Sequence, residues 1–352
     1  FVDAHSYWDH PRFPHKAWDA SDWLINNTPM VDQPERATLW SLIGTRVAGK
    51  PFTVTEYNHP APNEWQAECV PIIATCAALQ DWDGVFLFAY SHSADFEKEK
   101  VDGFFNIEGN PLKMPLMPMG ARLFLGGAIE PRGSAVGVAM PHELMVQTSP
   151  SLSTDQGAFL RSVLGLKWQH LLSKRISVHF DDTANDISGH AGGPEVGWTS
   201  DGAGTGTGRY TCFGPKAAVF TGFAAGRMPI DLGAVRIESL QMPFATIIVT
   251  PADPTTTIEQ ADRLLVMAVA RGQNTDMKWD AQRHTVSNEW GSAPPRVEVV
   301  RGSISVSGQW SHVRPLSSSG QPVDRDATTQ LAGGRTTIRL GETPALAYEV
   351  SR

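Results

Sequence analysis

The chain has 352 residues, a formal net charge of -8 and a sequence pI near 5.8, with no run rich in lysine or arginine. Such an acidic chain is a poor partner for nucleic acid or anionic membranes, and no apolar stretch reaches the roughly 18 residues of a membrane-spanning helix. With 41% hydrophobic and 19% charged residues, it has the composition of a globular protein and the length of two or three domains. Cys69, Cys76 and Cys212 lack the spacing of a zinc site, so we expect buried thiols and neither a metal nor a cofactor.

Residues 1–127 alternate short apolar strands with amphipathic helices. The expected strands cover 1–5, 52–55 and 85–90, and the expected helices cover 33–47, 64–79 and 115–124. The third strand is apolar throughout, which is typical of a strand buried on both faces of a parallel sheet. The strand–helix order therefore predicts parallel βα units in an α/β domain over 1–127.

The pattern changes from about residue 128. A helix expected at 155–172 precedes a strand at 175–180, and the Gly-rich stretch 189–208 is expected to be a loop. Short β-rich runs separated by turn signals then follow at 217–223, 245–249, 263–269, 296–300, 336–340 and 345–350. This spacing predicts an antiparallel β-sandwich domain over 128–352, with a connecting helix and a Gly-rich loop.

Polar and aromatic side chains crowd the ends of the three strands expected in the first domain. They are Asp3, His5, Tyr7, Trp8, Asp9 and His10 after the first strand, Glu56, Tyr57, Asn58 and His59 after the second, and Tyr90, Ser91 and His92 after the third. In parallel αβ barrels, functional residues lie at the C-terminal ends of the strands. Glu56, a carboxylate that closes an apolar strand, is therefore a candidate catalytic group.

These three segments, in their order and spacing, resemble the last three barrel strands of clan A glycoside hydrolases. The sequence Pro51-Phe-Thr-Val-Thr-Glu56-Tyr-Asn resembles the seventh strand, which ends in the nucleophilic glutamate, while His5-x-Tyr7 resembles the sixth strand and 82–90 the eighth. The stretches 264–274 and 290–295 resemble the β-sandwich that follows some of these barrels. The resemblance implies a partial (β/α)8 barrel, strands six to eight, in 1–127 and an antiparallel β-sandwich in 128–352.

The same resemblance implies an O-glycosyl hydrolase that cleaves a β-linked glycan with retention of configuration. Glu56 would attack the anomeric carbon while a second carboxylic acid protonates the leaving oxygen, with the two carboxyl groups about 5–5.5 Å apart. Tyr7 is expected to donate a hydrogen bond to Glu56, and His5 to steady the sugar or the carboxylate. The candidate substrate-binding residues are Trp8, Asp9, His10, Tyr57, Asn58, Trp65, Tyr90 and His92.

The chain departs from this family at the acid/base residue. In the family, that glutamate follows an asparagine at the end of the fourth strand, which would lie before residue 1. The pairs Asn63-Glu64 and Asn288-Glu289 both follow Glu56, and Glu64 is expected to begin a helix. Because a whole barrel takes about 250 residues, we expect a fragment or one part of a split enzyme, completed by an N-terminal barrel half or a partner subunit.

Two other functions remain open on the residues alone. Ser6 and Ser91-His92 lie among histidines and acids, so a serine-type esterase is one alternative; it requires a serine oxygen within hydrogen-bond reach of a histidine that an acid orients. The other is a non-catalytic carbohydrate-binding remnant, in which aromatic residues line a groove but no second carboxylate approaches Glu56. The sequence does not determine the cell compartment, an extracellular or periplasmic location being favoured over the cytoplasm.

Overall fold

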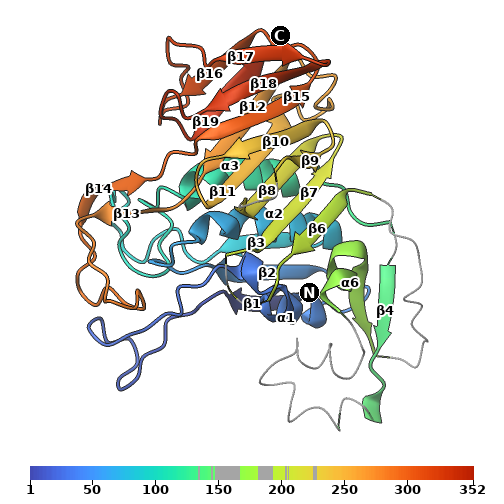
Figure 1. Ribbon diagram of the computed structural model, residues 1–352. Helices are drawn as coiled ribbons and strands as arrows, with labels where there is room; N and C mark the ends of the chain where they lie inside the picture. Colours follow the sequence, from blue (N-terminus) through green and yellow to red (C-terminus); the bar gives the residue numbers. More distant parts are fainter. Residues whose placement is uncertain are drawn as a thin grey trace.

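The computed structural model describes residues 1–133, 135–143, 146, 167–180, 193–202, 204, 206–224 and 228–352, and most of its regular structure is β-sheet (Figure 1). The helices are α1 (Leu39–Thr45), α2 (Cys69–Gln80), α3 (Lys113–Phe124) and α6 (Trp168–Ser173), with 3-10 turns at Met30–Asp32, Pro34–Arg36 and Gln66–Glu68. Among the described residues, no helix has the length and apolar character to cross a membrane.

A three-stranded parallel sheet is built from the first quarter of the chain. Its strands are β1 (Val2–Tyr7), β2 (Phe52–Asn58) and β3 (Gly84–Leu87), in that order across the sheet. The β-branched and aromatic residues of β2 suit a strand. The register between β1 and β2 shifts by one residue, so that Ala4 is opposite Val54 but His5 is opposite Glu56. This bulge at Thr55 re-aims the side chain that follows it.

Helix α2 lies between the parallel sheet and the larger antiparallel sheet (Figure 1). All of its 12 residues are buried, as expected for a helix that is apolar on every side. Its Thr75 hydroxyl lies 2.8 Å from the hydroxyl of Tyr210 in the antiparallel sheet, which satisfies two polar groups inside the core. The cysteine thiols of Cys69, Cys76 and Cys212 are buried and free.

Two antiparallel sheets form the upper part of the molecule in Figure 1. The larger has the order β16 (His312–Leu316), β19 (Ala347–Ser351), β12 (Arg263–Val269), β11 (Phe244–Pro251), β8 (Ala217–Phe223), β7 (Arg209–Gly214) and β6 (Glu195–Thr199). The smaller has the order β17 (Thr329–Ala332), β18 (Arg335–Leu340), β15 (Gly302–Ser307), β10 (Val235–Leu240) and β9 (Ile230–Leu232). Alternate side chains of β8 and β11 enter two cores: Val219 and Ile248 pack with α2, while Phe220 and Ile247 pack with the smaller sheet.

Two isolated strand pairs complete the described structure. Strands β4 (Ala135–Ala139) and β5 (Arg175–His179) are parallel, and β13 (Gly272–Thr275) and β14 (Ser292–Val297) are antiparallel. The segment between β13 and β14 reaches back to the loop after β1, where Ile25 N donates to His284 O at 2.8 Å. Asn274 likewise bonds both the N–H and the carbonyl of Val101. The C-terminal part of the chain therefore fixes the loops that follow β1 and β3.

The predicted partial (β/α)8 barrel is wrong. Most strands of the described residues belong to antiparallel sheets, and β1, β2 and β3 form an open sheet rather than part of a barrel wall. Parallel pairing follows from local strand–helix alternation, whereas barrel closure depends on contacts that this alternation does not encode. Buried residues on both sides of the expected boundary at 127, such as Leu123 and Val219, share one core. The helix expected at 155–172 and the loop at 189–208 lie partly outside the described residues.

The end of the Gly-rich segment is fixed by Asp32, whose side chain is fully buried. Its carboxylate accepts hydrogen bonds from the backbone N–H groups of Gly206, Thr207 and Gly208, at 2.8, 3.1 and 2.5 Å. A Cβ on Gly208 would come within 2.2 Å of Val31 O, so only glycine allows this approach. The backbone N–H groups at the end of this segment thus surround the Asp32 carboxylate, much as such groups surround a bound anion in other proteins.

Replacing Asp32 with asparagine is expected to lower the free energy of unfolding by about 2 kcal/mol, because three backbone N–H groups lose the carboxylate of a fully buried side chain as their acceptor. Urea denaturation monitored by tryptophan fluorescence measures this difference. Asp276→Asn is the matched control, since Asp276 is exposed and asparagine tolerates its left-handed backbone (φ 57°). Equal losses in the two variants would contradict a specific role for Asp32.

Candidate active site

The candidate active site lies where β1 and β2 end side by side. Tyr7, the last residue of β1, donates a hydrogen bond from its hydroxyl to Glu56 Oε2 at 2.6 Å. The Glu56 side chain is 31% exposed, so a ligand can reach it. The bulge at Thr55 sets this contact, because it moves Glu56 opposite His5 in the register. The hydrogen bond expected from Tyr7 is therefore present on an accessible carboxylate.

His5 links Glu56 to a second acid. Its Nδ1 lies 3.5 Å from Glu56 Oε2, and its Nε2 lies 3.1 Å from Asp3 Oδ2. Asp3 is in turn bonded by the hydroxyls of Thr53 and Thr55, at 2.8 and 2.5 Å. Burial acts to raise the pKa of Asp3, but the hydrogen bonds from these threonines bring that pKa below its ordinary value. The ring of His5 is thus held in one orientation between two carboxyl groups.

Asp3 was not among the predicted site residues, although the sequence carries a signal for it. Asp3, His5 and Tyr7 occupy alternate positions of one strand, and alternate side chains of a strand lie on the same face. The Thr53 and Thr55 hydroxyls that hold Asp3 come from the neighbouring strand. Their proximity depends on the pairing of β1 with β2, which the sequence alone does not specify.

Tyr7 remains protonated over the ordinary pH range. Burial raises its pKa well above the usual value for tyrosine, and the hydrogen bond to Glu56 and the Glu56 charge raise it further. A phenol that keeps its proton can only donate to this carboxylate. Both Tyr7 and His5 contact Oε2, which leaves Glu56 Oε1 without a hydrogen-bond partner among the described residues.

An aromatic cavity of about 570 Å³ adjoins Tyr7. Its lining includes Trp18, Phe88, Phe104, Phe105, His92 and Asn106. The Tyr7 ring lies 5.0 Å from the ring of Phe105 and 6.4 Å from that of Phe88, which connects the carboxylate site to the cavity. Trp18 is 63% exposed, so its ring is accessible from solvent.

The predicted substrate-binding residues divide into two groups. His10 and His92 lie beside the cavity: the ring of His10 is 5.4 Å from Tyr7 and 5.9 Å from Trp18, and His92 Nδ1 is 2.6 Å from Asn106 Oδ1. Sequence reasoning missed Trp18, Phe88 and Phe105, which lie in loops and strand ends with no distinguishing spacing.

Most of the other predicted substrate-binding residues contact the protein interior or its loops. Trp8, Tyr57 and Asn58 are buried, Asp9 accepts four hydrogen bonds from Asn26, Asn27 and Asn63, Trp65 packs against Phe223 and Phe244, and Tyr90 is exposed beside Phe96. The contacts of Trp8, Asp9 and Trp65 hold the loops around the site, whereas the exposed ring of Tyr90 remains accessible.

A fully buried polar network lies beneath the site. Lys113 Nζ donates to Asn58 Oδ1 and to His59 O, both at 2.6 Å, and Glu68 accepts from Met30 N and Val31 N at 2.6 and 3.0 Å. Burial lowers the pKa of Lys113 to about 8 and raises that of Glu68 to about 8. Lys113 connects α3 to the end of β2, two residues beyond Glu56.

The described residues contribute one further carboxylate to the hydrogen-bond network of Glu56, that of Asp3 through His5. Glu64 instead bonds Arg283 and Asn27, and Glu289 forms an exposed ion pair with Lys278. Neither Asn-Glu pair therefore supplies an acid to this site. Within the described part of the chain, no group of three or more His, Cys, Asp or Glu side chains is placed to bind a metal ion.

The serines considered for an esterase have other partners. Ser6 Oγ lies 3.1 Å from Ser41 Oγ and also bonds Thr38 O. Ser91 Oγ donates to Ser93 O at 3.1 Å. In the described residues, neither serine contacts a histidine, so the arrangement that this alternative requires is not formed at these positions.

Comparison with known protein families, with curated proteins and with solved structures found no match for this chain.

Proposed function

We propose that this chain carries the nucleophile of a retaining O-glycosyl hydrolase that acts on a β-linked glycan. The observation that carries the proposal is the 2.6 Å hydrogen bond from Tyr7 to Glu56, made beside an open aromatic cavity. A carboxylate held by a permanent donor, with one oxygen free, is suited to attack on carbon. Aromatic rings such as Trp18 and Phe105 suit the apolar faces of sugar rings.

In the proposed reaction, Glu56 Oε1 attacks the anomeric carbon and forms a glycosyl ester. The bond from that carbon to the leaving oxygen breaks, and the leaving oxygen keeps the electron pair and takes a proton from a second carboxylic acid. Water then cleaves the ester, giving its proton to the same carboxylate, and Glu56 is regenerated. Tyr7 and His5 hold Oε2, so that Oε1 faces the substrate.

The described residues around Glu56 do not include a suitable proton donor, because Asp3 is linked to Glu56 only through His5. We propose that an N-terminal segment or a partner subunit contributes that acid. The edge of the parallel sheet beside β1 supports this arrangement, since among the described residues β1 pairs only with β2 and keeps its other side available.

Trapping of the glycosyl ester tests the role of Glu56 without requiring a proton donor. Dinitrophenyl 2-deoxy-2-fluoro-β-glycosides of glucose, galactose, mannose and xylose have a leaving group that departs unprotonated. At least one is expected to add a fluorosugar to the chain, mapped by peptide mass to β2. Glu56→Gln should take up no label, whereas Glu289→Gln, which changes an exposed glutamate, should label as the parent does. Failure of every sugar to label Glu56 would overturn the nucleophile assignment.

Tyr7→Phe is expected to slow formation of this adduct by roughly 10- to 100-fold, because it removes one charge-assisted hydrogen bond from Glu56. The thermal unfolding temperature should change little, since the ring and its packing remain. Tyr90→Phe is the matched control: Tyr90 is exposed, and its ring is retained. Labelling rates that are the same in Tyr7→Phe and in the parent would show that the hydrogen bond has no part in the reaction.

A second candidate function is non-catalytic carbohydrate binding. It is favoured by the aromatic cavity next to Glu56, because in the described part of the chain the one further acid linked to Glu56 is Asp3. The labelling experiment separates the two functions. A binding protein would bind glucose, galactose, mannose or xylose, but it would form no ester with any of the four fluorinated glycosides.

A further inference from the structure

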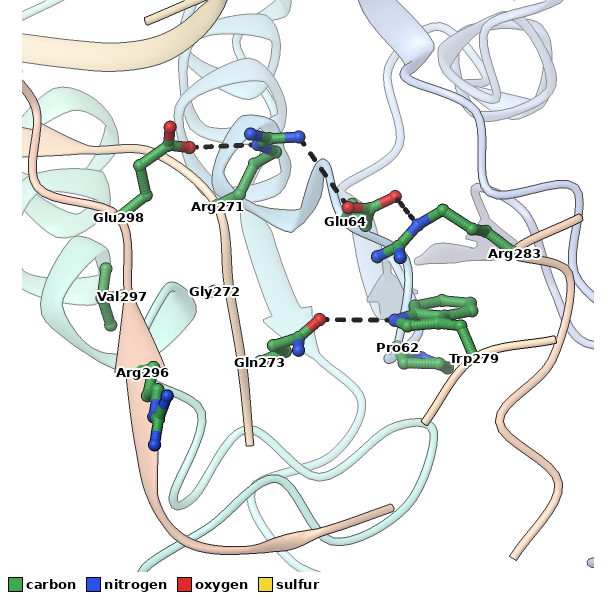
Figure 2. Close-up of a pocket in the computed structure, with 10 residues that line it drawn as sticks. All are labelled: Pro62, Glu64, Arg271, Gly272, Gln273, Trp279, Arg283, Arg296, Val297 and Glu298. Carbon is green, nitrogen blue, oxygen red and sulfur yellow. Dashed lines mark hydrogen bonds and ion pairs between the residues drawn. The ribbon is translucent and has the colours of Figure 1, made fainter. Parts of the chain in front are cut away.

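A second cavity, of about 550 Å³, opens between the loop after β2 and the β13–β14 hairpin. Figure 2 shows its lining, in which Pro62 and Glu64 come from the loop and the remaining residues come from the hairpin and its neighbouring segments. None of the residues at the candidate active site lines it. Its volume falls in the range of about 300–1,000 Å³ that is usual for small-molecule sites.

A chain of alternating charges forms one wall of this cavity. Glu298 accepts from Arg271 Nε at 3.0 Å, Arg271 lies 3.9 Å from Glu64 Oε1, and Arg283 Nε donates to Glu64 Oε2 at 2.8 Å (Figure 2). Asn27 holds Glu64 further, through its side-chain amide at 2.9 Å. Four charged side chains are thus fixed in place before any ligand arrives, which lowers the entropy cost of binding.

On the opposite wall of the cavity, Arg296 and Gln273 carry hydrogen-bond donors that take no part in this ion-pair network. Arg296 uses its Nε on Thr275 Oγ1 at 3.3 Å, and its two terminal amino groups have no partner among the described residues. Gln273 accepts from the indole N–H of Trp279 at 3.4 Å, which fixes its amide and leaves the amide NH2 available. A terminal guanidinium edge and a fixed amide are groups that bind a carboxylate or a sulfate.

The charge of the lining favours an anion. The cavity is lined by three arginines and two glutamates, a formal charge of +1, on a chain whose net charge is -8. Because Glu64 and Glu298 neutralise Arg271 and Arg283, the excess positive charge resides on Arg296. Arg283 covers one face of the Trp279 ring, with its guanidinium carbon 4.8 Å from the ring centroid. The remaining surface of Trp279 and that of Pro62 are apolar lining of the kind that sugar rings contact.

We infer that this cavity binds an acidic saccharide, that is, a sugar ring bearing a carboxylate or a sulfate ester. The acidic group pairs with the terminal amino groups of Arg296, the amide of Gln273 bonds a neighbouring oxygen, and the ring lies against Trp279. This site is separate from Glu56 and does not depend on the proposed hydrolytic function.

Ligand-observed NMR on the whole chain tests the inference. The probes are methyl β-glucuronide and methyl β-galacturonide, methyl β-glucoside and methyl β-galactoside carrying a 6-sulfate, and the two neutral glycosides. At least one acidic probe is expected to bind with a Kd of about 1 mM or tighter, and its neutral counterpart at least about 10-fold more weakly. Comparison of the uronide and sulfate arms identifies which anion the cavity takes.

Arg296→Ala is expected to weaken binding of the acidic probe about 10-fold. Lys278→Ala is the matched control, because Lys278 is an exposed cation in the same region, paired with Glu289, and lies outside the lining. Glu56→Gln should keep the full affinity, so that failure of the hydrolase proposal and failure of this inference are distinguishable. Three results overturn the inference: no acidic probe binds at about 10 mM, neutral and acidic probes bind equally, or Arg296→Ala retains the parent affinity.

Discussion

Replacement of Glu56 by glutamine is expected to reduce turnover of dinitrophenyl β-glycosides on the order of 10⁴-fold or more, as loss of a covalent nucleophile does in other hydrolases. An amide of the same shape still accepts the hydrogen bond from Tyr7, but it does not attack the anomeric carbon. The folded structure should therefore persist, with the thermal unfolding temperature close to that of the parent. Release of dinitrophenolate, followed by absorbance, gives the rate.

Chemical rescue makes the same prediction sharper. Glu56→Ala leaves space for azide on the face of the sugar that the carboxylate occupied. Azide then attacks the anomeric carbon, dinitrophenolate leaves with the electron pair, and the product is a glycosyl azide of inverted configuration. NMR of the product determines that configuration. Full activity in Glu56→Gln, or rescue that yields only hydrolysed sugar of retained configuration, would contradict a nucleophilic role for Glu56.

Lys113→Met is expected to lower the free energy of unfolding at pH 7 by about 2–4 kcal/mol. The change removes the buried amine and leaves Asn58 Oδ1 and His59 O without their 2.6 Å donor. Urea denaturation measures the loss. The control is Lys50→Met, which alters an exposed lysine and should change stability by no more than about 0.5 kcal/mol.

The same variant has a distinct pH dependence. Burial depresses the pKa of Lys113 from its ordinary value of 10.5 to about 8. A lysine with a depressed folded-state pKa contributes stability that is fully present above its unfolded pKa and is lost as the pH falls toward 8. The parent therefore gains stability between pH 8 and pH 10 from this group, and Lys113→Met does not. The difference between parent and variant should grow over that interval; a constant difference would mean that Lys113 is charged in both states throughout.

Local patterning in the sequence predicts that His5, Tyr7 and Glu56 follow two strands, and the structure brings these three side chains together. The apolar run that ends at Glu56 and the alternation of His5 with Tyr7 correspond to two neighbouring strands, β1 and β2. Because a strand places alternate residues on one face, the same alternation also contained Asp3. Period-two patterns of this kind are properties of short segments, so they can be read without knowledge of the tertiary structure.

The error in the fold has a physical origin. Strand–helix alternation over 1–127 predicts parallel pairing, and β1, β2 and β3 are indeed parallel. The sequence does not determine which element packs on α2, because this helix is apolar around its circumference and could pack on any apolar surface. An antiparallel sheet that begins some 120 residues after the end of α2 along the chain supplies that partner, through residues such as Tyr210 and Val219.

The sequence by itself placed His5, Tyr7 and Glu56 at the ends of two strands, because short-range patterns of polar and apolar residues are enough to locate such strands. Only the tertiary structure decided the bulge that turns Glu56 toward His5 and Tyr7, the assembly of Trp18 and Phe105 into one cavity, and the cleft around Glu64 and Arg296. Each of these joins segments far apart in the chain, and the energy of such contacts depends on shape and distance in the folded molecule rather than on the order of residues.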